Sequence, residues 1–186
     1  MSIRIYGNRL LKTLPGLGTR PTPARVREAV FNIWQGSIAG CRWLDLCGGS
    51  GSMGAEALCR GAKHAIALEQ SPRACSIIRE NWQQVTDENQ SFQVLRGDVV
   101  TLLKKIRDQQ FDRVYFDPPY ASDLYQPVLE IIAGKNLLAP DGEIGIEHQR
   151  DRVFPETIGN LEIARQKVYG NTGLTFYGYP SEDLLD

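Results

Sequence analysis

The stretch Trp43-Leu-Asp45-Leu-Cys-Gly-Gly49-Ser-Gly51-Ser-Met-Gly54 carries the strongest indication of how this chain folds. An apolar strand ends at Asp45, a glycine-rich turn follows, and the residues from Ser52 to Arg60 then have the composition of a helix. The three glycines fit the pattern G-x-G-x-x-G, in which glycine lets the backbone turn sharply and approach a ligand closely. The stretch therefore predicts a strand–loop–helix unit of an α/β protein, with a ligand at the loop.

The position of Asp45 favours one class of ligand over another. The glycine pattern alone also describes NAD-binding units. Asp45 lies four residues before the first glycine of the pattern, where a carboxylate would repel a pyrophosphate but attract the cationic aminoacyl end of S-adenosylmethionine. The alternative is that Asp45 only fixes the loop backbone. The residues expected to contact this cofactor here are Asp45, Gly49, Ser50, Gly51 and Gly54.

Acidic residues also follow the next strands of the predicted sheet. The run 64–69 ends in Glu69, which is suited to bind both ribose hydroxyls of the cofactor. After the strand at 92–95, Asp98 is expected to accept a hydrogen bond from the adenine amino group, and the Val99 amide to donate to a ring nitrogen. Any one of these acids could be a solvated loop charge. Four acids at successive strand ends predict one shared crevice, because those ends face the same edge of a parallel sheet; they are Asp45, Glu69, Asp98 and Asp117.

The tetrapeptide Asp117-Pro118-Pro119-Tyr120 indicates the chemistry. It follows the apolar run 114–116, and two prolines end a strand because neither donates to a ladder. The carboxylate of Asp117 and the carbonyl of Pro118 can each accept a hydrogen bond from the exocyclic amine of a nucleobase, while Tyr120 can stack on the base. The alternative is an ordinary Asp-Pro turn beside an aromatic residue. We expect catalytic roles for Asp117, Pro118 and Tyr120.

The charges are unevenly distributed along the chain. Residues 1–27 contain six basic and no acidic side chains, whereas the rest of the chain contains 15 basic and 22 acidic ones. A basic arm on an acidic body indicates contact with a phosphate backbone, although a solvated strand is the alternative. The residues expected to bind the nucleic acid substrate are Arg9, Lys12, Arg20, Arg25, Arg27, Tyr120 and Tyr169. Tyr169 is also interpretable as a turn residue.

The remaining pattern predicts an α/β doubly wound, mostly parallel sheet. Strands are expected near 43–47, 64–69, 91–95, 112–116 and 142–147 with helices between them, and 161–178 should form a hairpin. A helix begun by Thr22-Pro23 should bury one apolar stripe at i, i+3, i+4, i+7 and i+8. The stripe consists of Val26, Ala29, Val30, Ile33 and Trp34.

Composition is that of one catalytic domain. With 186 residues, 42% of them hydrophobic, one sizeable core is possible. No apolar stretch approaches the roughly 18 residues of a membrane span. The four cysteines show no C-x-x-C spacing, which predicts reduced thiols in the cytoplasm and no metal site. We expect a basic arm at 1–22, a catalytic domain at 23–179 and an acidic tail at 180–186.

Three motifs together resemble the RsmD family of bacterial 16S ribosomal RNA guanine-N2 methyltransferases. They are the segment 18–29 (Gly-Thr-Arg-Pro-Thr through Arg-Glu-Ala), Asp117-Pro-Pro-Tyr120, and the segment 169–176 (Tyr-Gly-Asn-Thr through Phe). The chain departs from the family pattern at Cys47, Gly48 and Asn171, which leaves the substrate contacts near Asn171 less defined.

The resemblance implies a class I methyltransferase fold with seven strands, of which one near the edge is antiparallel. It also implies S-adenosylmethionine as the cofactor. The implied substrate is ribosomal RNA within a small-subunit particle, with no membrane and no obligate protein partner.

Two other functions remain open from the sequence. Asp117-Pro-Pro-Tyr120 also occurs in DNA adenine-N6 and cytosine-N4 methyltransferases, but the chain has no spare segment for a target-recognition domain. A nicotinamide-dependent oxidoreductase would use the same glycine pattern, but it would leave the tetrapeptide without a role.

Overall fold

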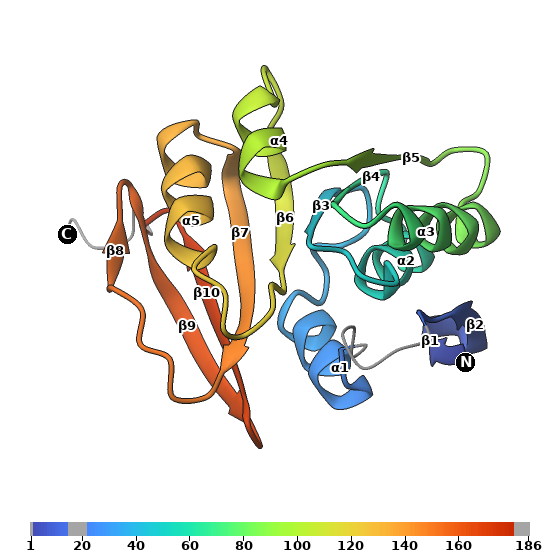
Figure 1. Cartoon of the computed structure of the whole chain (residues 1–186), viewed down its shortest axis with the longest axis horizontal. Helices are drawn as coiled ribbons and strands as arrows, with labels where there is room; N and C mark the ends of the chain where they lie inside the picture. The colour runs from blue at the N-terminus through green and yellow to red at the C-terminus, as the bar shows by residue number, and fades with distance from the viewer. Residues whose placement is uncertain (1, 15–21, 181–186) are drawn as a thin grey trace.

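The computed structural model describes residues 2–14 and 22–180; Arg20 and the expected tail beyond Pro180 lie outside the described residues. An eight-stranded sheet forms the centre, in the order β5-β4-β3-β6-β7-β10-β9-β8 (Figure 1). Its parallel strands are β3 (Arg42–Leu46), β4 (His64–Glu69), β5 (Ser91–Arg96), β6 (Phe111–Phe116) and β7 (Leu138–Gln149). Helices connect them, as expected for parallel neighbours: α2 (Ser52–Cys59), α3 (Pro72–Val85), α4 (Val99–Lys105) and α5 (Tyr125–Gly134). The predicted doubly wound sheet is confirmed.

The other end of the sheet is antiparallel. The predicted hairpin is formed by β9 (Leu161–Tyr169) and β10 (Thr172–Gly178), and β10 lies between β7 and β9. The two-residue strand β8 (Thr157–Ile158) pairs with β9 and makes eight strands where the resemblance implies seven. A very short edge strand of this kind leaves little backbone available for pairing with another chain.

Helices cover both faces of the sheet. Helix α1 (Ala24–Ile33) lies with α2 and α3 on one face, and α4 and α5 lie on the other. The predicted stripe of α1 is confirmed for its buried members, which pack with Trp43 and Phe176 of the sheet; they are Val26, Ala29, Val30 and Trp34. The end of α1 leads into the start of β3. The start of α1 therefore lies beside the carboxyl edge of the sheet (Figure 1).

The amino-terminal segment is a small separate sheet. Strands β1 (Ser2–Ile5) and β2 (Arg9–Lys12) pair antiparallel around the 3-10 turn η1 (Tyr6–Asn8). Ile5 and Leu11 are buried in the core shared with α1, α2 and α3. The expected basic arm therefore contains a folded β1–β2 hairpin that packs on the domain (Figure 1).

Among the helices that the structure describes, none is both long and apolar enough to cross a membrane.

Candidate active site

The carboxyl ends of the parallel strands bring the predicted acids together. The thiol of Cys47, in the loop after β3, reports this convergence. Burial, together with the carboxylates of all four strand ends, raises the pKa of Cys47 to about 12. Those carboxylates belong to Glu69, Asp117, Asp45 and Asp98. The thiol is therefore protonated, and it lies among the four carboxylates of the predicted acidic crevice.

The glycine loop is shaped by its packing on Trp82 of α3. Gly51 has the left-handed φ of 72°, which glycine adopts without strain. The indole Nε1–H of Trp82 donates to the Gly51 carbonyl at 2.7 Å. At Gly54 a Cβ atom would stand 2.1 Å from Cζ2 of Trp82, so only glycine fits there. The loop thus brings its backbone close to α3, as the glycine pattern predicts.

Asp45 is buried at the floor of this loop. It is 2% exposed, and its Oδ2 accepts a hydrogen bond from the Gly54 amide at 3.1 Å. Burial and, to a smaller extent, the charge of Glu69 together raise the pKa of Asp45 to about 7. Both interpretations of Asp45 therefore have structural support. It fixes the loop backbone, and it is a poorly solvated carboxylate that a bound cation would stabilise.

Glu69 and Asp98 also hold backbone amides. Oε2 of Glu69 accepts from the Gly49 amide at 3.1 Å, and Oε1 accepts from the Ser71 amide at 2.8 Å. Oδ1 of Asp98 accepts from the Thr101 amide at 2.8 Å, which lowers the pKa of Asp98. Each carboxylate oxygen has a second lone pair. Both side chains can therefore accept from a ligand hydroxyl or amine while they keep these bonds.

Asp117 stands at the end of β6 in a strongly negative environment. Burial raises the pKa of Asp117 well above the ordinary range, and the carboxylates of Glu147 and Asp45 raise it further. A hydrogen bond from the Thr22 side chain opposes this shift. Pro118 is buried, and the amide of Ser122 closes a turn on the Pro119 carbonyl at 2.8 Å. The tetrapeptide is therefore a fixed turn that carries a basic carboxylate.

Glu147 is a buried acid beside the predicted site that the sequence analysis did not include. It is 3% exposed near the end of β7, and it accepts hydrogen bonds from the hydroxyls of Tyr115 at 2.6 Å and Tyr120 at 3.0 Å. The Tyr120 hydroxyl also lies 3.1 Å from Oγ1 of Thr172. A signal was present, because Glu147 ends the predicted strand 142–147 just as the other acids end theirs.

Tyr120 is partly exposed and is anchored by its hydroxyl. Its exposed fraction is 36%. Burial raises the pKa of Tyr120 to about 12, so the hydroxyl stays protonated and donates to Glu147. An anchored, partly exposed aromatic ring is suited to stack on a planar ligand.

The predicted substrate residues divide into an exposed group and a buried one. Arg9 and Lys12 are exposed on the β1–β2 hairpin, where Lys12 pairs with Glu80 at 2.6 Å. Arg25 is exposed at the start of α1, and its guanidinium lies 5.8 Å from the ring centroid of Tyr169. Arg27, by contrast, is buried.

Arg27 is a structural residue, and the prediction that it binds substrate is wrong. It is 4% exposed. Its Nε donates to Glu56 at 2.6 Å, and its Nη2 donates to the Arg4 carbonyl at 2.8 Å. The guanidinium thus joins α1, α2 and the β1–β2 hairpin. A buried arginine with these partners is unavailable to a phosphate, because breaking the pair would remove one of the two guanidinium partners of the buried Glu56, the other being Arg60.

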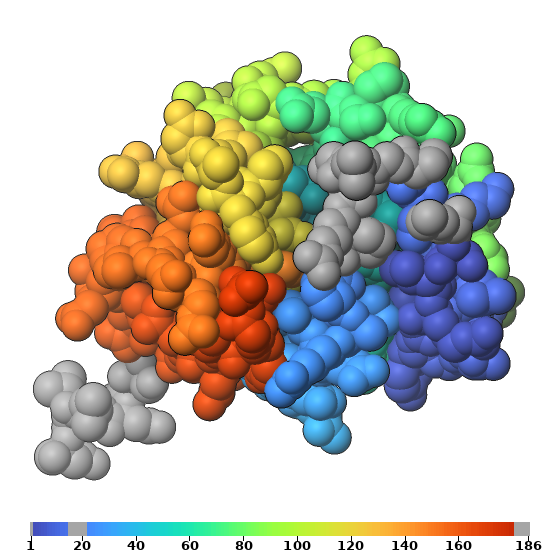
Figure 2. Space-filling view, turned by 60° about the horizontal axis from the view of Figure 1, so that its bottom comes forward, coloured from blue at the N-terminus to red at the C-terminus, as the bar shows by residue number. Residues whose placement is uncertain are grey.

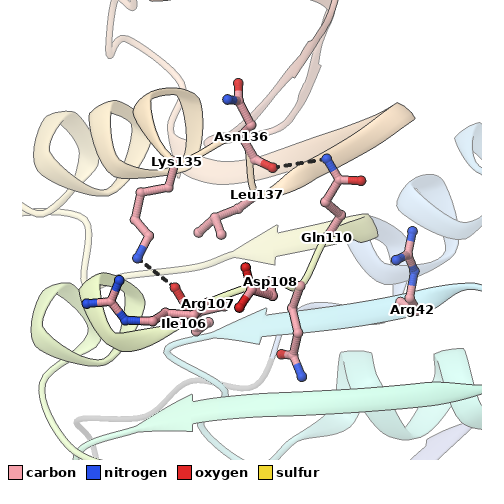
Figure 3. Close-up of a pocket in the computed structure, with 9 residues that line it drawn as sticks. Arg42, Ile106, Arg107, Asp108, Gln110, Lys135, Asn136 and Leu137 are labelled. Carbon is pink, nitrogen blue, oxygen red and sulfur yellow. Dashed lines mark hydrogen bonds between the residues drawn. The ribbon is translucent and has the colours of Figure 1, made fainter.

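A hollow of about 570 Å³ lies at the opposite edge of the sheet (Figure 3). It is bordered by Arg42 at the start of β3, by the segment after α4, and by Lys135 to Leu137 after α5. Figure 3 shows Lys135 directed to the carbonyl of Ile106, with Nζ at 2.6 Å from it. None of the predicted site residues borders this hollow. Within the described ranges, no group of three or more His, Cys, Asp or Glu side chains could hold a metal ion.

Comparisons with known proteins find relatives that match nearly the whole chain. A relative from Bacillus subtilis, described as a putative rRNA methyltransferase YlbH, is 36% identical over 171 residues, or 91% of this chain and 92% of that protein. The ribosomal RNA small subunit methyltransferase D of Haemophilus influenzae is 30% identical over 93% of this chain and 90% of its own. A solved structure described as the putative methyltransferase yhhF from Escherichia coli superposes with a TM-score of 0.82. That protein is 27% identical, and the superposition covers 98% of this chain and 100% of that chain.

The family model described as Conserved hypothetical protein 95 matches residues 3–178. That range includes the β1–β2 hairpin, the acidic crevice and the β9–β10 hairpin. The chain therefore belongs to this family, which is the RsmD family that its sequence motifs resemble.

Proposed function

We propose that this protein is an S-adenosylmethionine-dependent methyltransferase that modifies the exocyclic N2 amino group of a guanine in 16S ribosomal RNA. The observation that carries the proposal is the turn Asp117-Pro-Pro-Tyr120 at the end of β6, beside an acid-lined glycine loop. The turn offers two acceptors for an amine and one anchored ring for a base. The loop offers buried negative charge to a cationic cofactor.

The cofactor is held by the strand ends of β3, β4 and β5. Bound S-adenosylmethionine supplies a sulfonium methyl group that is already activated for transfer. The carboxylate of Asp45 and the backbone of Gly49 to Gly51 bind its aminoacyl end. Glu69 accepts hydrogen bonds from the ribose hydroxyls. Asp98 and the Val99 amide bind the adenine edge. These acceptors fit a ligand that carries positive charge. Burial disfavours the ionised form of Asp45, and an approaching cation would stabilise that form.

Asp117 and Pro118 activate the amine. The lone pair of guanine N2 is delocalised into the ring, so the free amine is a poor nucleophile. Hydrogen bonds from its two N–H groups to the Asp117 carboxylate and the Pro118 carbonyl localise that pair for in-line attack. With the cofactor bound, the nitrogen would take the methyl group as the sulfur–carbon bond breaks toward sulfur, and Asp117 would accept the nitrogen proton. The raised pKa of Asp117 makes its carboxylate a stronger proton acceptor.

Tyr120 orients the base for this attack. Its ring stacks on guanine, a contact that contributes about 1–3 kcal/mol in other proteins that bind bases. Glu147 and Thr172 are positioning residues, because they hold the Tyr120 hydroxyl at 3.0 and 3.1 Å. Orientation is a large part of such catalysis and can lower a barrier by about 7–11 kcal/mol.

The proposed substrate is ribosomal RNA within a small-subunit particle. The descriptions of the relatives as rRNA methyltransferases support the class of substrate. A base inside a helix must be flipped out before its amine can reach the crevice, and an unpaired base lowers that cost.

The decisive experiment maps the methyl group. The enzyme and isotope-labelled S-adenosylmethionine are incubated with unmodified small-subunit particles, with naked 16S RNA and with duplex DNA, and the methylated nucleotide is identified by mass spectrometry. We expect N2-methylguanosine in the RNA, and most of it in the particle. The Asp117→Asn variant serves as the control for background labelling.

Label on adenine or cytosine of the DNA would support the alternative of a DNA methyltransferase. Label on an RNA position other than guanine N2 would refute the base assignment. No transfer to any of the three substrates by a protein that binds the cofactor would refute the proposed function.

A further inference from the structure

Three segments remote in sequence meet beside Tyr120. The amide of Arg150, after β7, donates to the Asn171 carbonyl at the tip of the β9–β10 hairpin at 3.0 Å. Arg25 of α1 lies over the ring of Tyr169 in the same tip. In Figure 2 the light-blue α1 and the orange-to-red segments around β10 form one continuous face.

This face is rich in exposed cations. Arg25, Arg150 and Lys167 are exposed and Arg152 is partly exposed. The exposed acids within three residues of them in the sequence are Glu28 and Asp151, whereas Glu156 and Glu162 lie farther along the same segments. The pair between Arg150 and Asp151 has an N–O distance of 3.6 Å, with exposed fractions of 54% and 82% for the two side chains. An ion pair this exposed holds its partners weakly. The face therefore keeps a positive excess on a chain whose net charge is −1.

The register of β9 and β10 places Lys167 and Tyr169 on the same face of the sheet as Thr172. Lys167 is paired with Leu174, and Tyr169 with Thr172, so the four side chains project from the same face of the sheet. Thr172 is the residue that contacts the Tyr120 hydroxyl. Tyr169 therefore lies next to the residue that contacts Tyr120, and Lys167 lies two residues farther from it along β9.

Arg152 joins the cationic face to the catalytic turn. Its Nη2 donates to the Tyr120 carbonyl at 3.1 Å, and its guanidinium lies 4.1 Å from the ring centroid of Tyr125. One donated bond leaves most of the five N–H donors of an arginine for other acceptors. A cation in this place is held beside the backbone of Tyr120.

We infer that Arg25, Arg150, Arg152, Lys167 and Tyr169, here called the tip surface, bind the RNA backbone next to the methylated nucleotide. The inference rests on the proposed function and adds a second RNA contact, separate from the β1–β2 hairpin. A nucleotide whose base is stacked on Tyr120 carries its flanking phosphates onto the adjacent face, where arginine and lysine side chains bind them. The Arg25–Tyr169 pair provides a stacking platform for a neighbouring base.

The test compares two double variants that each remove two positive charges. Arg150→Ala with Lys167→Ala changes the tip surface without touching Asp117, Tyr120 or the cofactor loop. Lys105→Ala with Arg107→Ala is the matched control at the opposite edge of the sheet, where Arg107 borders the hollow of Figure 3. The probe is a fluorescently labelled transcript of full-length 16S RNA, titrated at several salt concentrations.

We expect the salt slope of binding to fall by about 1.4 in the tip variant, since each phosphate contact to a single strand contributes about 0.7. When salt is raised from about 50 to about 200 mM, the affinity of the tip variant for RNA should therefore fall by a factor about sevenfold smaller than the affinity of the wild type does. The control variant should keep the wild-type slope. The affinity for S-adenosylmethionine, measured by calorimetry, should be equal in all three proteins.

Equal slopes for the wild type and the tip variant would overturn the inference, as would an equal loss in the control variant. The two proposals fail separately. If the wild type methylates no RNA but the tip variant still has the lower slope, the proposed function fails and the tip surface remains an RNA-binding face. If the wild type methylates RNA and the slopes are equal, only the tip surface fails.

Discussion

Asp45 and Glu147 are carboxylates that folding buries, and the charges of both act on the partly buried Asp117. Burial raises the pKa of Asp45 and of Asp117, and neighbouring carboxylates contribute to both shifts, so ionisation at neutral pH is costly in the ligand-free protein. A cationic ligand offsets that cost. Electrostatics at the residue scale therefore connect cofactor binding and proton transfer to pH.

The affinity for S-adenosylmethionine should rise as pH increases through about 7. Asp45 has a raised pKa of about 7, so it is protonated below that pH and ionised above it, and only the ionised form attracts the cofactor cation. Below the pKa, affinity should fall by up to about tenfold per pH unit. Calorimetric titration at several pH values on both sides of 7 measures this affinity. Asp45→Asn retains an oxygen for the Gly54 amide but should bind weakly with a flat profile; a wild-type profile in that variant would contradict the assignment.

Substitutions of Asp117 and Glu69 should separate catalysis from cofactor binding. Asp117→Ala should abolish transfer while cofactor affinity falls little, because Asp117 contacts the amine. Glu69→Ala should weaken cofactor binding, since each lost charge-assisted hydrogen bond costs about 1.5–3 kcal/mol. Single-turnover rates at saturating cofactor and calorimetric affinities measure the two effects. Near wild-type turnover in Asp117→Ala would refute the mechanism.

Glu147→Gln should move the pH–rate profile. The charge of Glu147 raises the pKa of Asp117, so its removal lowers that pKa and the acidic limb of the rate profile should shift to lower pH. Tyr120→Phe is the matched control, because it removes the hydrogen bond to Glu147 but leaves the charge. That variant should be slower by about tenfold, or about 1.4 kcal/mol for one lost orienting bond, with the limb unmoved. Identical limbs in all three proteins would exclude Glu147 from the proton transfer.

At the scale of elements, α3 joins the β1–β2 hairpin to the cofactor loop. Asn81 is 1% exposed, and its Nδ2 donates to the carbonyls of Lys12 and Ser50, both at 2.9 Å. Its Oδ1 accepts from the Lys12 amide at 2.9 Å. One buried amide therefore satisfies backbone groups of two segments that have no sequence proximity, and the neighbouring Trp82 holds Gly51.

Asn81→Asp should destabilise the protein and weaken cofactor binding together. The carboxylate would face two carbonyl oxygens without a donor, and each buried group left unsatisfied costs about 1–3 kcal/mol. Chemical denaturation and calorimetry measure the two effects. Gln84→Ala is the control, because Gln84 is exposed and donates to the hairpin only at Leu10, at 3.4 Å. If Asn81→Asp bound the cofactor as tightly as the wild type, the glycine loop would not depend on the hydrogen bonds of Asn81.

At the scale of the whole molecule, the charge asymmetry of the sequence becomes a difference between surfaces. The acidic crevice suits the cofactor, whereas the cations of the β1–β2 hairpin and the tip surface lie on either side of α1 (Figure 2). An RNA chain approaching the crevice would be repelled by its carboxylates unless cations nearby bind the phosphates.

Replacing Arg9, Lys12 and Arg20 with alanine should weaken RNA binding and reduce its salt slope by about 2, at about 0.7 per contact. Cofactor affinity should not change, since the pair between Lys12 and Glu80 is exposed and contributes about 1 kcal/mol at most. The Lys12 backbone keeps its bonds to Asn81 in this variant. Titrations of both proteins with small-subunit RNA at several salt concentrations measure the effect. Slopes equal to the wild type would assign the hairpin to packing alone.

The sequence by itself determined the α/β sheet, the stripe of α1, the glycine loop and the convergence of four acids at one edge. Each depends on local chemistry, because apolar periodicity, glycine conformations and proline pairs act within a few residues. The rule that parallel strand ends share an edge then places the acids together. The same rule, applied to the strand at 142–147, also indicates Glu147.

Only the tertiary structure decided the roles of Arg27, Asn81 and Glu147. Arg27 lies beside the apolar stripe of α1 and carries a charge, so its pattern indicates exposure, yet Glu56 and the Arg4 carbonyl hold it in the interior. Asn81 and Glu147 contact residues 69 and 27 positions away, at Lys12 and Tyr120. The partner leaves no periodic or local signal, even where the position does, as at Glu147, because the burial that makes a polar side chain bind a particular partner exists only after distant segments have packed.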